Sequence, residues 1–188
     1  MDEIDGFFSS YPEFDYDRSA SSPREFYRMC DQFGWRKDKD GLYPREGQTA
    51  HAEFRKAMVR GFNSGFGVDV NSPAAWESMC HLLRISPVPD TLQGMRDAVK
   101  SIYVNLSDLL DGRRSGTRIR TFDTREELAA YTIREGRIFP KKEAYAGGIL
   151  RYLLREITGT YEVRRADATR GGRGRSGRGR GSGGKKKQ

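Results

Sequence analysis

The sequence predicts a single, mostly α-helical domain of five or six helices with a minor two-stranded β element, followed by a disordered basic tail. Apolar residues recur at spacings of three and four along several segments, which is the spacing of one face of a helix. Serine, threonine and proline stand where these segments begin. The last twenty residues contain no aromatic or aliphatic side chain and cannot join a core. We therefore place the domain at residues 6–163 and the tail at residues 164–188.

In the first part of the domain, the sequence predicts an aromatic segment followed by two helices. Residues 6–17 interleave five aromatic residues with acids, and we expect the rings to pack on the domain rather than remain in water. Ser22 and Pro23 fit the N-cap and the first position of a helix. A charged, turn-rich loop is expected at residues 36–48, and a second helix over residues 50–67, where glycines end it.

The start of the first helix recurs fifty residues later in the chain. The pattern of the first helix is formed by Ser22, Pro23, Phe26, Met29 and Cys30. The same pattern, with tryptophan in place of phenylalanine, is formed by Ser72, Pro73, Trp76, Met79 and Cys80. A duplicated helical hairpin would produce this similarity, and so would two independent helices with the same capping chemistry.

Residues 92–112 carry the strongest helical pattern of the chain. Their apolar side chains form one stripe, made of Leu92, Met95, Val99, Ile102, Leu106 and Leu109. We expect one continuous helix that ends at Gly112. Because the stripe lasts less than three heptads, a surface that faces the core is favoured over a dimeric coiled coil.

Two short strands are expected after this helix. Arginine alternates with isoleucine and threonine over residues 118–121, which indicates a strand, and residues 137–139 form a second candidate. Thr124 and Glu127 form a capping box that opens a helix between them. Strands joined by a helix would pair in parallel, as a small βαβ unit.

A final helix is expected over residues 143–157. The side chains that would face the core are Ile149, Leu150, Leu153 and Ile157. Gly147 and Gly148 near its start lower helix stability, and close packing against a neighbouring backbone would explain them.

The charge of the chain is unevenly distributed. Residues 164–188 hold ten Lys and Arg residues against one acid, whereas residues 1–163 hold 24 bases and 25 acids. The formal net charge of +8 therefore belongs to the tail. A basic tail of this kind favours a polyanionic partner, because each base that neutralises a phosphate releases counterions. A merely solubilising tail is the alternative.

The sequence offers little that an enzyme would need. Cys30, His51, Cys80 and His81 lack the paired spacing of a zinc site, and both cysteines are expected to be buried, inert thiols. We expect no catalytic residue, no metal and no cofactor. The acidic N-terminus lacks the features of a secretory signal, and no apolar run reaches membrane-spanning length. We therefore expect an intracellular protein that does not enter a membrane.

Basic residues are the candidate binding residues. Four arginines crowd one turn of the domain, and Arg137, Lys141 and Lys142 would lie nearby if the two strands paired; a solvated face balanced by nearby glutamates is the alternative. The predicted nucleic-acid-binding residues of the domain and the tail are Arg113, Arg114, Arg118, Arg120, Arg170, Arg173, Arg175, Arg178, Arg180, Lys185, Lys186 and Lys187.

Two parts of the chain resemble known groups. One resemblance concerns the body, over residues 7–157. It rests on the motifs Phe8, Tyr11-Pro12, Phe14, Tyr16-Asp17, Phe33-Gly34-Trp35, Val88-Pro89-Asp90-Thr91, Val104-Asn105-Leu106 and Tyr145-Ala146-Gly147-Gly148. In these the body resembles a group of short fungal proteins of uncharacterised function, which implies no activity. The tail has four Arg-Gly pairs and resembles the glycine–arginine boxes of RNA-binding and nucleolar proteins. That resemblance implies RNA binding and arginine methylation.

Three functions follow as hypotheses. The first is an RNA-binding accessory protein of low sequence specificity, nuclear or nucleolar, in which the tail binds RNA or another polyanion. The second is an adaptor whose helical domain binds a protein partner and whose tail is a localisation signal. The third is a small enzyme that uses carboxylates of the acidic front half. The sequence does not indicate an oligomeric state.

Overall fold

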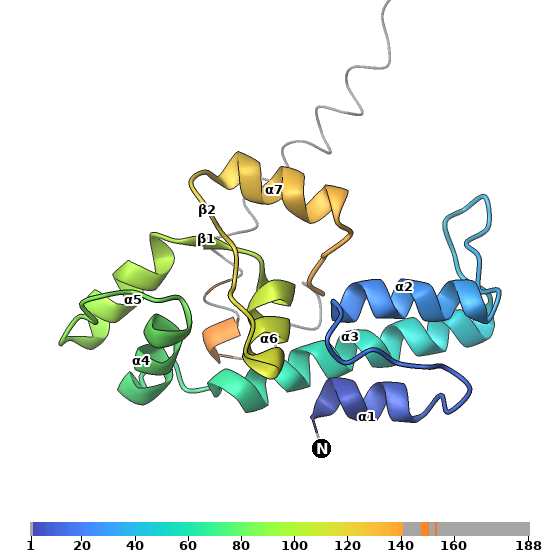
Figure 1. Cartoon of the computed structure of the whole chain (residues 1–188), viewed down its shortest axis with the longest axis horizontal. Coiled ribbons are helices and arrows are strands. Elements are labelled where there is room, and N and C mark those ends of the chain that lie inside the picture. Colours follow the sequence, from blue (N-terminus) through green and yellow to red (C-terminus); the bar gives the residue numbers. More distant parts are fainter. Residues whose placement is uncertain (1, 141–147, 151–152, 154–188) are drawn as a thin grey trace, which may run out of the picture.

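The structure is a computed structural model (Figure 1), and it describes residues 2–140, 148–150 and 153. The long helix α3 (Arg45–Phe66) contacts α1 (Glu3–Ser9), α2 (Ser22–Gln32), α4 (Pro73–Leu82) and α6 (Leu106–Ser115). In Figure 1, α1 and α2 run alongside α3, and α4 packs with α5 (Leu92–Lys100) beyond its C-terminal end. The described fold is mostly helical, as the sequence predicts.

The N-terminal aromatic segment packs on the domain, which confirms the expectation for its rings. Asp2 caps α1 by accepting from the backbone N–H groups of Ile4 and Asp5. Phe7 and Phe8 of α1 are buried, so the helix has a hydrophobic face that it can cover only by lying on α3. Helical structure begins at Glu3, ahead of the expected domain start at residue 6, and the expected end at residue 163 lies outside the described residues.

The helices α2 and α4, which share a sequence pattern, also share their ends. Both begin with proline in the first turn, and both stop at a residue in the left-handed region, Gly34 with φ of 70° and Arg84 with φ of 58°. In each, the cysteine carbonyl accepts from the backbone N–H five residues later. Similar capping chemistry accounts for this geometry without requiring a duplication.

The expected continuous helix over residues 92–112 is wrong, because the chain breaks there into α5, the strand β1 (Tyr103–Val104) and α6. Asn105 causes the break: its side-chain oxygen accepts from the N–H groups of Ser107 and Asp108 and so starts a new helix. The apolar stripe still faces the core on both sides of the break, where Met95, Val99, Leu106 and Leu109 are buried.

The expected parallel βαβ unit is also wrong. β1 pairs antiparallel with β2 (Thr121–Phe122), so one strand comes from within the expected helix. Residues 137–139 form no strand in the described part of the chain, because their backbone terminates α7 (Arg125–Arg134). The Arg137 N–H donates to the Thr132 carbonyl after Gly136 has turned the chain. β2 and α7 cover a small second core formed by Phe122, Leu128 and Tyr131.

Two other expectations for the C-terminal part are confirmed. Thr124 caps α7 by accepting from the Glu127 N–H. Residues 148–150 and 153 are helical, and Ile149, Leu150 and Leu153 are buried in the main core. Gly148 lies against the Val68 carbonyl so closely that a Cβ atom there would sit 1.7 Å from the oxygen. This is the close backbone approach that the glycine predicts; Gly147 and Ile157 lie outside the described residues.

Replacing Gly148 by alanine should therefore destabilise the fold by about 1–3 kcal/mol, because either the helix or the Val68 segment must move. Gly61→Ala in α3 is the matched control. A Cβ atom at position 61 meets its nearest side chain at 3.6 Å, an ordinary contact, and alanine favours the helix. Urea unfolding of both variants measures the difference. Equal free energies of unfolding for the two variants would contradict the close approach at Gly148.

Candidate nucleic-acid interface

The four arginines predicted to form the basic surface of the domain occupy one stretch of chain. Arg113 and Arg114 lie in the last turn of α6, and Arg118 and Arg120 lie in the segment that leads from Gly116 into β2. The structure separates them into one buried and three exposed residues. The predicted tail residues, from Arg170 to Lys187, and Lys141 and Lys142 lie outside the described residues.

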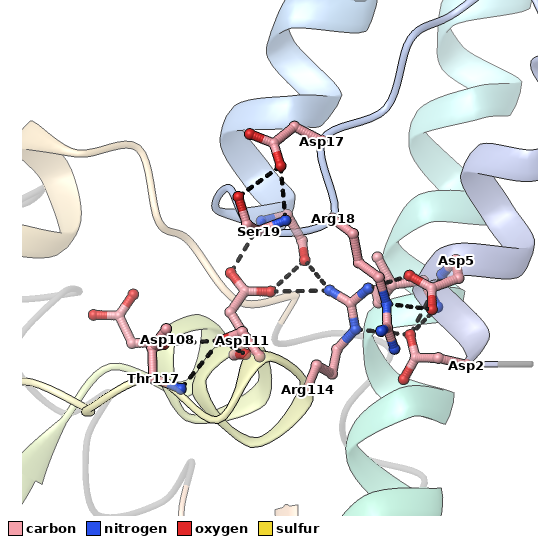
Figure 2. A network of polar contacts seen from close by, with 12 residues as sticks. Asp2, Asp5, Asp17, Arg18, Ser19, Asp108, Asp111, Arg114 and Thr117 are labelled. Carbon is pink, nitrogen blue, oxygen red and sulfur yellow. Dashed lines mark hydrogen bonds and ion pairs between the residues drawn. The ribbon is translucent and has the colours of Figure 1, made fainter.

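Arg114 is the buried member of the group, with a side chain only 3% exposed. Figure 2 shows its guanidinium group between carboxylates of the N-terminal segment and the Asp111 carboxylate of α6. Its Nε donates to Asp2 at 2.8 Å and its Nη2 to Asp5 at 2.5 Å. Nη2 also donates to the Tyr16 hydroxyl at 2.8 Å. Nη1 lies 3.4 Å from Asp111 of its own helix.

The network continues through Ser22, the first residue of α2. The Arg114 Nη1 donates to the Ser22 hydroxyl at 3.0 Å, and the Ser22 hydroxyl and N–H both donate to Asp111. Burial raises the pKa of Asp111, although Ser22 and Arg114 act in the opposite direction. For Arg114 burial works against the charge, but Tyr16, Asp2 and Asp5 together raise its pKa above the ordinary value. Arg114 is therefore a permanently charged structural residue.

This arrangement corrects the prediction for Arg114. Its hydrogen-bonding groups are already used by Asp2, Asp5, Tyr16 and Ser22, and its side chain is closed to solvent. A phosphate group could reach it only if α1 left its place. We accordingly remove Arg114 from the candidate interface.

Replacing Arg114 by methionine should lower the free energy of unfolding by about 3 kcal/mol, because the change leaves the partly buried carboxylates of Asp2 and Asp111 without their counter-charge. Arg113→Met removes the same charge from the neighbouring exposed position and should cost less than about 1 kcal/mol. Urea unfolding of the two variants provides the comparison. A loss at Arg114 as small as that at Arg113 would show that the buried network does not stabilise the fold.

The other three arginines of the group remain accessible. Arg113 lies over the Phe66 ring at 5.5 Å, with its guanidinium group close to Gly65 of α3. Arg118 is exposed, and its side chain has no ion pair or hydrogen bond within the described residues. Arg120 is exposed and lies over two aromatic rings, Phe122 at 5.0 Å and Tyr131 at 5.3 Å. All three could present donors to a phosphate.

The structure adds an arginine that the sequence did not indicate. Arg134 lies 5.8 Å from the centroid of the Tyr131 ring, and Arg137 lies 5.7 Å from it. We call Tyr131 with Arg120, Arg134 and Arg137 the Tyr131 cluster. Arg134 follows Tyr131 by three residues in α7, a spacing that puts two side chains on one helix face and could have identified it. Arg120, the residue before β2, comes to the same ring because α7 packs against β2.

Asp108 of α6 holds two members of the Tyr131 cluster in place. It is buried, and it accepts from Arg137 and pairs with the Tyr131 hydroxyl. Burial and the hydrogen bond with Asp108 raise the pKa of Tyr131 to about 12. Tyr131 therefore stays a neutral donor at physiological pH and contributes no negative charge to the cluster.

Three carboxylates of the front half lie together beside α1. A shallow depression of about 310 Å³ beside α1 is lined in part by Asp2, Glu3 and Glu53. Each of them already has a cationic partner, which is Arg114 for Asp2, Arg60 for Glu3 and Lys56 for Glu53. The hydrogen bond with Lys56 lowers the pKa of Glu53, which is the opposite of the shift that a general acid requires.

Both cysteines lie in the core, as the sequence predicts. Burial raises the pKa of Cys30 to about 11, against the effect of its hydrogen bond with Tyr43, and burial also raises the pKa of Cys80. A thiol in this state is a poor nucleophile. Among the described residues, no three His, Cys, Asp or Glu side chains are grouped so that they could hold a metal ion.

The Cys30 thiol should make the fold less stable at alkaline pH. In the folded protein it keeps its proton to about pH 11, whereas the unfolded chain loses it near the ordinary value of 9.0. The stability that the protonated thiol contributes is complete below pH 9 and is lost as the pH rises towards 11. Urea unfolding at pH 8 to 11 should show a shallower decline for Cys30→Ala than for the natural chain. Identical declines would place the thiol in contact with water.

No helix within the described residues is long and apolar enough to cross a membrane. Comparisons of the chain with protein-family models, with curated proteins and with solved structures find no match. The function is therefore inferred from the chemistry of the chain itself, and the resemblances of the body and the tail remain predictions.

Proposed function

We propose that the protein is a nucleic-acid-binding accessory protein that prefers RNA and uses the Arg/Gly-rich tail as its main affinity element. The observation that carries this proposal is the separation of charge along the chain. Ten cations and one acid occupy residues 164–188, whereas residues 1–163 carry a net charge of −1. A body with this balance has no overall attraction for a polyanion, so most of the electrostatic affinity must come from the tail.

Arginine and glycine suit this role for different reasons. The guanidinium group presents a planar fork to phosphate oxygens and a flat face to unpaired bases. Glycine restricts the backbone least, so neighbouring arginines can follow an irregular strand. Since the tail contains no aromatic residue, base stacking must use guanidinium planes, and sequence specificity should be low. A basic tail also fits a nuclear or nucleolar protein, with Lys185, Lys186 and Lys187 as part of an import signal.

Arg113, Arg118 and Arg120 support the proposal as the part of the footprint on the folded body. They are exposed in the structure, and neither Arg118 nor Arg120 has a carboxylate partner within the described residues. Their stretch of chain already belongs to the more basic half of the body, because residues 112–163 hold 11 bases and seven acids.

A second candidate is the protein-interaction adaptor, which one observation favours. Ile133 and Ile138 are each 60% exposed at the C-terminal end of α7 and in the segment that follows it. Contiguous exposed apolar patches mark protein contact surfaces, and these two side chains are candidates for such a patch. In this case the tail would act only as a localisation signal.

Removing the tail should separate the two candidates. The full chain should bind a single-stranded RNA at low salt, and the affinity should fall on the order of 10³-fold between 50 and 200 mM salt if about six phosphates are contacted. A chain of residues 1–163 should lose most of this affinity. Fluorescence anisotropy with labelled RNA measures both effects. Unchanged affinity without the tail would contradict the proposal, and absence of binding by the full chain at low salt would favour the adaptor.

A further inference from the structure

The Tyr131 cluster concentrates positive charge on the folded body in an unusual way. The guanidinium carbons of Arg120, Arg134 and Arg137 all lie within 5.8 Å of the centre of one aromatic ring. They come from three parts of the chain, which are the segment before β2, the last turn of α7 and the residues after it. Charges this close repel each other within the Debye length, about 10 Å at 0.1 M salt. The Tyr131 ring and nearby anions offset part of this repulsion.

The described carboxylates compensate the cluster only in part. Asp108 is buried and already bound to Arg137 and the Tyr131 hydroxyl. Glu135 pairs with the Nε of Arg134 at 2.9 Å and keeps a side chain that is 36% exposed. Arg134, Arg137 and the exposed Arg24 all lower the pKa of Glu135, with Arg134 the main cause. Asp111 also helps to raise the pKa of Arg137, but it is paired with Arg114 of its own helix. Four arginines therefore face Asp108, Glu135 and this shared third carboxylate, and positive charge remains.

The arginines are also held in place with donors to spare. Arg137 is fixed by Asp108, and Arg120 is fixed by its contacts with Phe122 and Tyr131. A guanidinium group carries five N–H donors, and the hydrogen bonds of Arg134 and Arg137 to Glu135 and Asp108 use one side-chain donor each. Arg120 donates none of its side-chain N–H groups within the described residues. A ligand that accepts several hydrogen bonds would meet groups whose positions are already set.

We propose that the Tyr131 cluster is a phosphate-binding site of the folded body, next to the exposed arginines named above, and that it holds the backbone of the RNA whose tail-driven binding is proposed above. In the free protein, Glu135 occupies the anion position beside Arg134, and a phosphodiester group displaces it. Phosphate oxygens accept paired hydrogen bonds from one guanidinium group, and successive phosphates of a strand can engage neighbouring arginines. The tail can contact RNA in many arrangements. The Tyr131 cluster would add one fixed point at which the RNA attaches to the domain.

The first test is an increase in affinity, which misfolding cannot imitate. Glu135→Gln in the full chain removes the resident anion and should raise the affinity for a labelled single-stranded RNA several-fold. Glu126→Gln changes the charge equally, on the same helix, but outside the cluster, and should have a smaller effect. Equal gains from the two substitutions would overturn the proposal, because only the net charge would then matter.

The second test removes arginines from the cluster. The double variant Arg120→Gln/Arg134→Gln should lose about tenfold more affinity than Arg36→Gln/Lys39→Gln, which removes two exposed charges from the loop after α2. The slope of the logarithm of affinity against the logarithm of salt concentration should fall by about 0.7 for each phosphate that the variant no longer binds. Circular dichroism and thermal unfolding check that both variants fold. Asp108, Arg137 and Tyr131 stay unchanged because they are part of the packing.

The outcomes distinguish the site from the proposed function. If the full chain binds RNA but the cluster and control variants lose equal affinity, the site is wrong and RNA binding through the tail stands. If the full chain binds no RNA at low salt, both proposals fail. Binding of polyglutamate is measured as a comparison with RNA. If the cluster variant loses as much affinity for polyglutamate as for RNA, the assignment to phosphate is wrong and the site fits an acidic protein.

Discussion

The buried guanidinium group of Arg114 holds together three segments that are far apart in the sequence. Asp2 and Asp5 bring α1 to it, Ser22 brings the start of α2, and Asp111 belongs to α6 itself. A buried charge without partners would cost several kcal/mol, so the fold is stable only when these segments converge. Because α1 has seven residues and could not form alone in water, its place on α3 depends on this network and on the burial of Phe7 and Phe8.

The same constraint decides which arginines remain available for binding. Arg113 and Arg114 are neighbours in sequence, yet successive side chains on a helix point about 100° apart. One therefore points into the acidic network, and the other lies on the surface over Phe66. Asp108 and Asp111 stand one turn apart on α6, and Asp108 anchors Arg137 of the Tyr131 cluster. A single helix thus connects the structural network at α1 with the proposed phosphate site at α7.

Much of the fold follows from patterns that are local in sequence. Pro23, Pro73 and the Thr124 cap mark the starts of helices in the structure, and the predicted apolar faces are buried. The predictions failed where a short polar signal competed with a longer apolar one. Asn105 is a single residue within a strong helical stripe, but the hydrogen bonds of its side chain with two N–H groups stop one helix and start the next. The stripe persists because both pieces cover the same core.

The sequence by itself determined the helical class, the starts of α2, α4, α5 and α7, the buried thiols and the charged tail, because each depends on residues within a few positions of one another. It could not distinguish a buried arginine from an exposed one in the same turn, since that depends on where Asp2 and Asp5 lie, more than a hundred residues away. It also could not bring Arg120 to Tyr131, which requires α7 to pack against β2. Only the tertiary structure settles such contacts, because burial and charge compensation are properties of groups that meet through folding.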